Sequence, residues 1–156
     1  MAKAVLLTGS NLGNRLGYME RACDLICAEA GPLVVKSGIY ETAPWGFHSE
    51  NFFLNQAVVI NTELSPFGLL DAIQEIEKRL GREREEPDIG KEKNYSSRTM
   101  DIDIIFYDDL VMEAGRLTIP HPLTCQRDFV LNPLKEIMPD FVHPVTGQKI
   151  CDIEVR

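Results

Sequence analysis

Apolar and polar residues alternate along the segment that begins at Met100. Met100, Ile102 and Ile104 are apolar, and Asp101 and Asp103 lie between them. A repeat of two residues is typical of a half-buried β-strand, in which successive side chains point to opposite faces. We therefore predict a strand whose apolar residues face the core and whose two aspartates share the other face.

The chain before this strand has the patterning of alternating strands and helices. Residues 4–8 and 52–62 are mainly apolar and residues 33–42 are rich in Val and Ile, which favours three strands. After the first strand, apolar residues recur at spacings of three and four. This predicts an amphipathic helix ended by Gly31-Pro32, with a core face made of Leu16, Met19, Cys23, Ile26 and Ala30.

A second helix is predicted to begin at Pro66. Ser65 is a favourable N-cap, proline is common at the first helical position, and Gly81 marks the end of the helix. Gln74 and Glu77 are three residues apart and share one side of this helix. The core face consists of Leu70, Ile73, Ile76 and Leu80.

The remaining segments are shorter or lack a period. Residues 82–97 are charged and without periodicity, which is typical of a lid, a binding loop or a disordered segment. Our hypothesis is a lid that carries Arg84 and Tyr95 over bound substrates. Beyond the aspartate strand, Asp108-Asp109 predicts a turn and Asn132-Pro133 a helix start. Short strands or extended segments are expected at residues 110–112 and 116–122, and a terminal hairpin at residues 143–148.

The order of predicted elements is β-α-β-β-α-β. This order is typical of a ferredoxin-like α+β sandwich, an antiparallel sheet backed by helices. The length of 156 residues suits one domain over residues 1–156. We find no internal repeat and no linker that would divide it.

Charge is distributed unevenly. The net charge of −8 argues against a nucleic-acid surface as the main function. Nine of the sixteen Lys and Arg residues lie between Lys78 and Arg127, so an acidic protein has one locally cationic zone. Such a zone suits an anionic ligand such as ATP, although a solvated face of mixed charge would explain Lys78 and Arg79 equally well.

Cysteine usage and hydropathy indicate the environment. The four cysteines form no metal-ligand pattern and are interpreted as small buried residues: Cys23, Cys27, Cys125 and Cys151. No signal peptide precedes the first strand and no apolar run is long enough to span a membrane. We expect a cytoplasmic monomer that uses neither membrane nor nucleic acid.

The aspartate strand is the strongest candidate for chemistry. Two carboxylates on one strand face can hold Mg²⁺ together with water or phosphate oxygens, and paired metals can clamp a phosphoryl group in transfer. A strand with a solvated polar face is the alternative. Cations nearby favour a nucleotide triphosphate site, because arginine matches phosphate oxygens: Arg98, Arg116, His121 and Arg127.

These features resemble the 6-hydroxymethyl-7,8-dihydropterin pyrophosphokinase family. The resemblance runs in order over nearly the whole chain and is carried by Gly9-Ser-Asn-Leu-Gly13, Tyr40-Glu-Thr-Ala-Pro-Trp-Gly46, Phe53-Leu-Asn55, Gln74-Glu-Ile-Glu77, Gly81-Arg-Glu-Arg84, Arg98-Thr-Met-Asp-Ile-Asp-Ile-Ile105 and Arg116-Leu-Thr-Ile-Pro-His121. It implies a ferredoxin-like fold and an enzyme of folate biosynthesis. The implied reaction moves the β- and γ-phosphoryl groups of ATP together to the hydroxymethyl oxygen of the pterin and releases AMP.

The resemblance also implies roles for individual residues. Two Mg²⁺ ions would be held by Asp101 and Asp103, which form the catalytic set with Arg82, Arg84 and Arg98. ATP would be bound by Gln74, Glu77, Arg98, Ile104 through its backbone, Arg116, Thr118, His121 and Arg127. The pterin would be bound by Thr42, Pro44, Trp45, Phe53, Asn55, Tyr95 and Phe129, with the ring between Phe53 and Phe129.

The chain departs from the family pattern at three places. Phe53 lacks the hydroxyl that many members have there, Pro122 replaces a common tyrosine after His121, and the loop before Arg98 is longer, with Tyr95 near the place of the usual tryptophan. Two other classes stay open on the residues alone. One is another two-metal enzyme such as a nucleotidyl cyclase or nuclease, and the other is a ferredoxin-like RNA-binding module.

Overall fold

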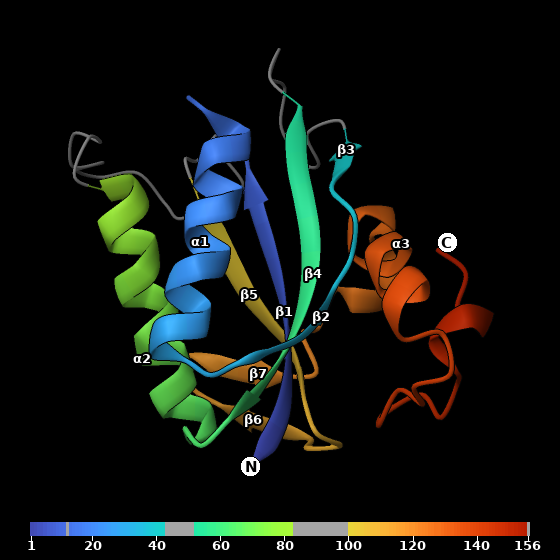
Figure 1. Ribbon diagram of the computed structural model, residues 1–156. Coiled ribbons are helices and arrows are strands. Elements are labelled where there is room, and N and C mark those ends of the chain that lie inside the picture. Colours follow the sequence, from blue (N-terminus) through green and yellow to red (C-terminus); the bar gives the residue numbers. More distant parts are fainter. Residues whose placement is uncertain (12, 43–51, 83–99, 156) are drawn as a thin grey trace.

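The computed structural model describes residues 1–11, 13–42, 52–82 and 100–155, without the side chain of Arg82 (Figure 1). The predicted loop over residues 82–97 therefore lies almost wholly outside the described residues. The same holds for five of the predicted site residues: Pro44, Trp45, Arg84, Tyr95 and Arg98.

One antiparallel sheet forms the centre of the molecule. Its strands run in the order β2-β4-β1-β5, and β3 also pairs with β4, beyond the end of β2. Helices α1 and α2 connect the strands in the predicted βαββαβ order. The bounds are β1 Ala2–Ser10, α1 Arg15–Glu29, β2 Leu33–Lys36, β3 Tyr40–Thr42, β4 Phe53–Thr62, α2 Pro66–Glu77 and β5 Asp101–Tyr107. The predicted α+β ferredoxin-like architecture is confirmed.

Smaller elements complete the chain. A π-helical turn, η1, continues α2 over Lys78–Arg82, so helical structure extends past the predicted end at Gly81. After β5 the chain forms a two-stranded hairpin, two short 3-10 turns and a third helix. These are β6 Met112–Ala114, β7 Leu117–Ile119, η2 Thr124–Gln126, α3 Asp128–Ile137 and η3 Ile150–Asp152.

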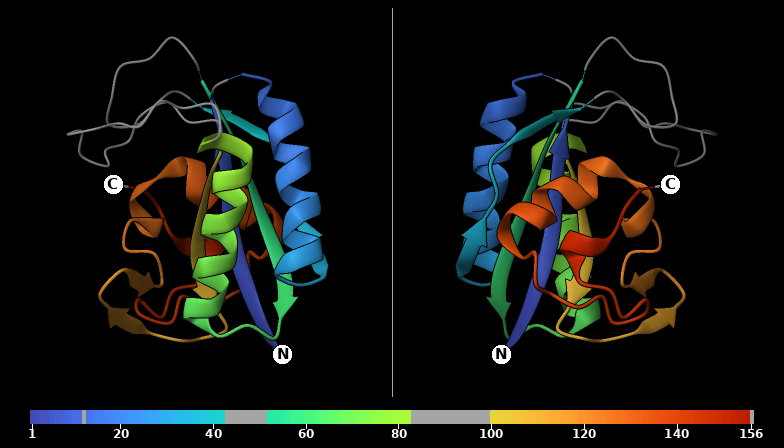
Figure 2. Two further views of the ribbon diagram at one scale, coloured as in Figure 1. Left: turned by 90° about the vertical axis from the view of Figure 1, so that its left-hand side faces the viewer. Right: turned by 90° about the vertical axis from the view of Figure 1, so that its right-hand side faces the viewer.

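The sheet has an apolar core on each face. Alternate residues of β1 divide between them: Leu6 packs with the cluster beneath α1 and α2, and Leu7 with the cluster beneath α3. Figures 1 and 2 show α1 and α2 together on one side of the sheet and α3 on the other. We call the side covered by α3 the α3 face. Met100, Ile102 and Ile104 belong to the opposite cluster, which confirms the predicted alternation of the aspartate strand.

The predicted strand over residues 33–42 is interrupted. Ser37 ends the regular pairing of β2, because its hydroxyl accepts a hydrogen bond from the backbone N–H of Ala57 at 2.9 Å. The Gln56 side chain donates to the Ser37 carbonyl at 2.7 Å. These side-chain bonds fix the chain at a point where it leaves the ladder, and β3 then resumes at Tyr40.

Some predictions about helices and cysteines are wrong. The third helix starts at Asp128 rather than at Asn132-Pro133, and Pro133 lies inside it because burial of its neighbours outweighs the lost hydrogen bond. In α1 Leu16 is 51% exposed, and in α2 Leu69 takes the core position expected of Leu70, which is only partly buried. Cys27 and Cys151 are exposed, so they are not the buried residues predicted.

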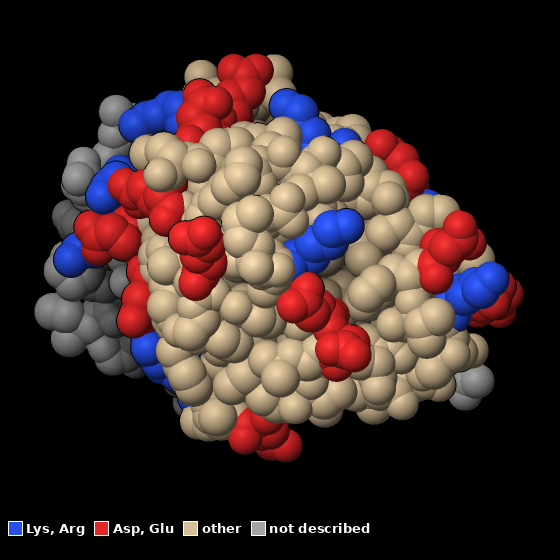
Figure 3. Space-filling view, turned by 60° about the horizontal axis from the view of Figure 1, so that its bottom comes forward, with Lys and Arg blue, Asp and Glu red and all other residues tan. Residues whose placement is uncertain are grey.

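Charges of both signs are mixed on the surface. On the face shown in Figure 3, Lys and Arg side chains alternate with Asp and Glu among uncharged residues. This part of the surface therefore lacks the continuous positive charge that is typical of a nucleic-acid-binding face. Within the described residues, no helix is both long enough and apolar enough to cross a membrane.

A buried histidine organises the C-terminal turn. The Nδ1 atom of His143 accepts hydrogen bonds from the backbone N–H groups of Val145 and Thr146 at 3.1 and 3.2 Å. The ring lies edge-on to Phe106, with 5.5 Å between ring centres, and burial lowers the pKa of His143 below its usual 6.5. The folded protein thus holds this histidine neutral, as an acceptor.

Protonation of His143 should lower the stability of the protein as the pH falls. A lowered folded-state pKa means that the unfolded chain binds the proton first, so the stabilisation is complete above about pH 6.5 and declines as the pH falls below it. We expect the variant His143→Asn, which keeps an acceptor but does not titrate, to lose less Tm than wild type between about pH 7.5 and pH 5.5. Equal losses of Tm in thermal scans of the two proteins would contradict this. The variant His121→Asn separates the contribution of His121, whose pKa is also lowered.

Candidate active site

The register of the sheet places four residues side by side across the α3 face. Tyr40 of β3 pairs with Asn55 of β4, Asn55 with Gly9 of β1, and Gly9 with Asp101 of β5. Residues directly opposite each other in an antiparallel ladder point to the same face. One row thus joins the predicted pterin ligand Asn55 to the predicted metal ligand Asp101, with a glycine between them.

Gly9 leaves an open position in the middle of this row. A Cβ atom built on it would lie 3.0 Å from Asn55 Oδ1 and 3.9 Å from Cδ1 of Phe53. Neighbouring strands are about 4.8 Å apart, so the strand positions of Asn55 and Asp101 are about 10 Å apart across the glycine. This spacing can accommodate a flat ring or a phosphate group between an amide and a carboxylate.

The two aspartates lie on one face of an edge strand. Asp103 is opposite Leu7, whose side chain packs with the cluster beneath α3, so Asp101 and Asp103 both point to the α3 face. Both are half-buried. Within the described residues no group of three His, Cys, Asp or Glu side chains could hold a metal. Two carboxylates with phosphate and water oxygens suit Mg²⁺, which keeps several non-protein ligands.

Glu77 anchors the aspartate strand from the opposite side of the sheet. Its carboxylate Oε2 accepts a hydrogen bond from the backbone N–H of Ile102 at 3.0 Å. Ile102 lies between the two aspartates, and among the described residues β5 is the last strand of the sheet, so one side of its backbone has no strand partner there. Glu77 therefore fixes the backbone that presents Asp101 and Asp103. This contact supports the aspartate strand directly, whereas the role predicted for Glu77 was ATP binding.

His121 is held beside this strand at an irregularity in the pairing. Ile105 is an extra residue in β5, a β-bulge between the partners of Leu6 and Val5, and its carbonyl accepts from the His121 backbone N–H at 3.0 Å. Burial lowers the pKa of the imidazole, while the charge of Asp101 opposes this shift. The Nδ1 atom accepts from the Leu123 N–H at 3.3 Å, so a neutral His121 carries its proton on Nε2.

Arg127 and Phe129 approach the same face from the start of α3. The Arg127 side chain is only 2% exposed, and burial lowers its pKa to about 10, so the guanidinium remains charged at neutral pH. Its central carbon lies 5.4 Å from the centre of the Phe129 ring. A buried cation close to an aromatic ring suits an anionic substrate that also contains a flat heterocycle.

The remaining predicted ATP ligands lie along α2 and β7. Arg116 contacts α2: its Nη2 donates to the Asp71 carboxylate at 2.8 Å and its Nη1 to the Gln74 side-chain oxygen at 3.4 Å. Thr118 pairs with Glu113 in the hairpin, between two buried residues of β7. Ile104 is 4% exposed and faces the core, as expected of a residue that could act only through its backbone.

The predicted pterin ligands of the sheet form a contiguous group. The Asn55 side chain is 4% exposed and its Nδ2 donates to the Thr42 hydroxyl at 2.9 Å, which leaves Oδ1 toward Gly9. Thr42 is opposite Phe53, so both side chains share the α3 face with Asn55. Phe129 stands at the first turn of the helix that covers this face.

Three residues at or beside the site were not among the predicted ones. Gly9 was part of the matched motif at residues 9–13 but had no role, and its missing side chain creates the central gap. Tyr40 belongs to the same row. Arg15 links Glu41 of β3 to the residue before β4, since its Nη1 lies 2.8 Å from the Phe52 carbonyl and 3.4 Å from the Glu41 carboxylate. Tyr40 was also part of a matched motif, at residues 40–46, without a role, and the strand register places it opposite Asn55.

The fold is a ferredoxin-like sheet, and the row brings an amide, an open glycine position and a carboxylate to one face of it. The family model for 7,8-dihydro-6-hydroxymethylpterin-pyrophosphokinase matches residues 5–139. The chain belongs to this family.

Curated relatives and solved structures agree. The 2-amino-4-hydroxy-6-hydroxymethyldihydropteridine pyrophosphokinase of Methylorubrum extorquens is 41% identical over 143 residues, which cover 91% of this chain and 86% of the relative. That of Bacillus subtilis is 42% identical and the match covers 86% and 77%. The crystal structure of Plasmodium falciparum HPPK-DHPS superposes with a TM-score of 0.77 at 18% identity; the match covers 97% of this chain and 44% of that one, so this likeness shows the fold alone.

The gap at Gly9 should be required for substrate binding. In the variant Gly9→Ala the new methyl group meets Asn55 Oδ1, and we expect pterin binding to weaken by about 1–3 kcal/mol, the usual cost of overpacking. Calorimetric titration measures this. Gly68→Ala is a matched control, because its Cβ would lie 3.1 Å from the Ser65 hydroxyl, equally tight but in α2. Unchanged pterin affinity in Gly9→Ala would show that the gap is not used.

Proposed function

We propose that this chain transfers pyrophosphate from ATP to the hydroxymethyl oxygen of 6-hydroxymethyl-7,8-dihydropterin and releases AMP, a step of folate biosynthesis. The single observation that carries the proposal is the row across the α3 face, in which Asn55, Gly9 and Asp101 are adjacent. A heterocycle held at Asn55 and a metal-bound phosphate held at Asp101 would then meet over the glycine. Family membership supplies the reaction that fits this arrangement.

The metal-binding part of the site consists of Asp101 and Asp103. We infer that they hold two Mg²⁺ ions, which would neutralise the triphosphate and orient it when bound. The carboxylates point to the α3 face, away from the cluster beneath α1 and α2, on a strand whose backbone Glu77 fixes, so the strand that carries the donors is held before metal and nucleotide arrive. Pre-placed donors reduce the cost of assembling the site.

Residues in and around α3 and β7 would neutralise the negative charge of the phosphates. His121 lies near Asp101, and a neutral His121 can donate from Nε2. Arg127 stands at the start of α3, on the same side of the sheet. Arg116 would reach the nucleotide by exchanging its contacts with Asp71 and Gln74 for phosphate oxygens. Thr118, Ile104, Arg82, Arg84 and Arg98 keep their predicted roles in this proposal. Catalysis then depends mainly on positioning and charge neutralisation, as is general for phosphoryl transfer.

The pterin would be recognised by its polar edge and its two faces. Asn55 offers an amide that can donate and accept, and Thr42 orients it through the 2.9 Å hydrogen bond. Phe53 and Phe129 would stack on the ring. Pro44, Trp45 and Tyr95 are proposed to complete the pocket. We also propose that residues 1–156 act as one domain and as a monomer; a cytoplasmic location stays a prediction.

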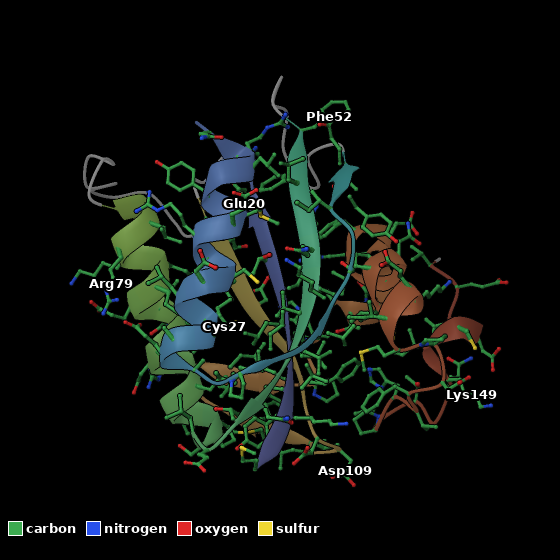
Figure 4. The ribbon with its side chains drawn as sticks, in the orientation of Figure 1. Glu20, Cys27, Phe52, Arg79, Asp109 and Lys149 are labelled. Atoms are coloured by element: carbon green, nitrogen blue, oxygen red, sulfur yellow. The ribbon has the colours of Figure 1, made fainter. Side chains whose placement is uncertain are left out.

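The metal role of the aspartates can be tested by charge removal. We expect Asp101→Asn or Asp103→Asn to reduce AMP formation by about 10³-fold or more, because metal clamping of transferring phosphate supplies several kcal/mol. The fold should persist, since both side chains lie outside the apolar core. Asp109→Asn, in the exposed turn at the far end of β5 (Figure 4), is the control. Near wild-type turnover of either site variant in saturating Mg²⁺ would refute the metal assignment.

The pterin role of Asn55 predicts a selective loss. Asn55→Ala removes the donor and acceptor that face the ring, and the unsatisfied ring edge should cost about 1–3 kcal/mol in pterin binding. ATP binding, which depends on the other side of Gly9, should change little. Calorimetry with each ligand separately measures the difference, and Asn61→Ala, at the far end of β4 opposite Lys3, is a control for polar loss in this strand. Equal losses for both ligands would exclude a pterin-specific role.

A further inference from the structure

We propose that Glu136 is a positioning residue that holds β3 against α3 and thereby fixes the distance between the two walls of the pterin pocket. This inference rests on the proposed function, since it concerns the same pocket. Glu136 was not among the predicted site residues, and it lies in the last turns of α3, away from the aspartates.

The exposed Glu136 carboxylate accepts hydrogen bonds from two donors in the chain around β3, one of them shared between its two oxygens. The Gly38 backbone N–H lies 3.2 and 3.0 Å from Oε1 and Oε2, and the Tyr40 hydroxyl donates to Oε1 at 2.7 Å. Hydrogen bonds to a carboxylate are stronger than those between neutral groups. The hydrogen bond to Glu136 also raises the pKa of Tyr40 above its ordinary value, as expected of a hydroxyl that donates to an anion.

The segment that Glu136 binds has little other support. β3 consists of three residues and, within the described part of the chain, pairs with β4 alone. Ser37 and Gln56 fix the chain just before Gly38, so the unsecured stretch begins at the residue that Glu136 binds. A Cβ built on Gly38 would lie 3.5 Å from Glu136 Oε1, an ordinary van der Waals distance, so Glu136 packs directly against this stretch of backbone.

The two ends of this contact belong to opposite walls of the pocket. Glu136 and Phe129 are seven residues apart, which is two helical turns, so both lie on the same side of α3. On the other wall, Tyr40 is opposite Asn55, and two residues further Thr42 accepts the Asn55 amide hydrogen. Loss of the Glu136 contact would allow α3 and β3 to separate, and Phe129 and Asn55 would no longer hold the ring together.

The contact should leave the nucleotide side of the site intact. Asp101, Asp103 and His121 are positioned by β5, by its pairing with β1 and by the bond from Ile102 to Glu77. None of these interactions passes through β3. A residue that only stabilises the fold would affect both ligands, whereas a residue that positions β3 should affect the pterin alone.

The test compares Glu136→Ala, Tyr40→Phe and the double variant in calorimetric titrations with pterin and with the Mg²⁺ complex of a non-hydrolysable ATP analogue. We expect the pterin Kd to rise about tenfold in Glu136→Ala, the scale of a lost charge-assisted hydrogen bond, and the nucleotide Kd to stay within about twofold. Tyr40→Phe should give part of this effect. The double variant should be no worse than Glu136→Ala, because the two residues act as a pair.

Asp140→Ala is the matched control, since it removes an exposed carboxylate just beyond α3. If Glu136→Ala binds pterin as this control does while Asn55→Ala binds it weakly, the positioning role is wrong and the proposed function stands. If Asn55→Ala also binds normally, the pocket itself is wrong and the inference falls with it. Equal losses for both ligands in Glu136→Ala would show a purely structural contact. Tyr40→Phe, which removes one hydroxyl, decides the question if Glu136→Ala does not fold.

Discussion

The pairing register of β1 with its two neighbours is the constraint on which the rest of the site depends. β1 lies between β4 and β5, so its register with each strand fixes which residues of the two are opposite the same glycine. Asn55 and Asp101 are 46 positions apart in the numbering, yet the ladder brings them to either side of Gly9. The apolar residues that alternate with them hold this register, because a slip of one residue would expose core side chains and bury the aspartates.

The sequence predicted the fold well where the pattern had a simple period. The alternation in β5 and the N-cap at Ser65 indicated correct elements, since burial and capping were local properties there. Prediction failed where tertiary contacts decided the outcome. Pro133 lies within α3 because its neighbours are buried, and β2 ends before Ser37, where the Gln56 side chain bonds the Ser37 carbonyl and the Ser37 hydroxyl bonds the Ala57 N–H.

The candidate site shows the same division. Asp101 and Asp103 were predicted from the alternation in β5, and Thr42 and Asn55 from motif resemblance; the register brings Thr42, Asn55 and Asp101 to one face. The sequence could not show that Glu77 binds the backbone of the aspartate strand, or that Glu136 binds the strand that carries Tyr40. Both are side-chain bonds between segments distant in sequence, which no local period records. In each case a carboxylate on a helix secures a strand at the edge of the sheet.

The bulge at Ile105 has a consequence for how this protein family can vary in length. Deletion of Ile105 would restore regular pairing between β1 and β5 and would leave Asp101 and Asp103 on their face, at the expense of the carbonyl that holds His121. Deletion of Ile102 would instead make the two aspartates adjacent and turn them to opposite faces. Insertions and deletions in this strand should therefore be tolerated during evolution only on the C-terminal side of Asp103. There a change in the number of residues does not alter the face to which the two carboxylates point.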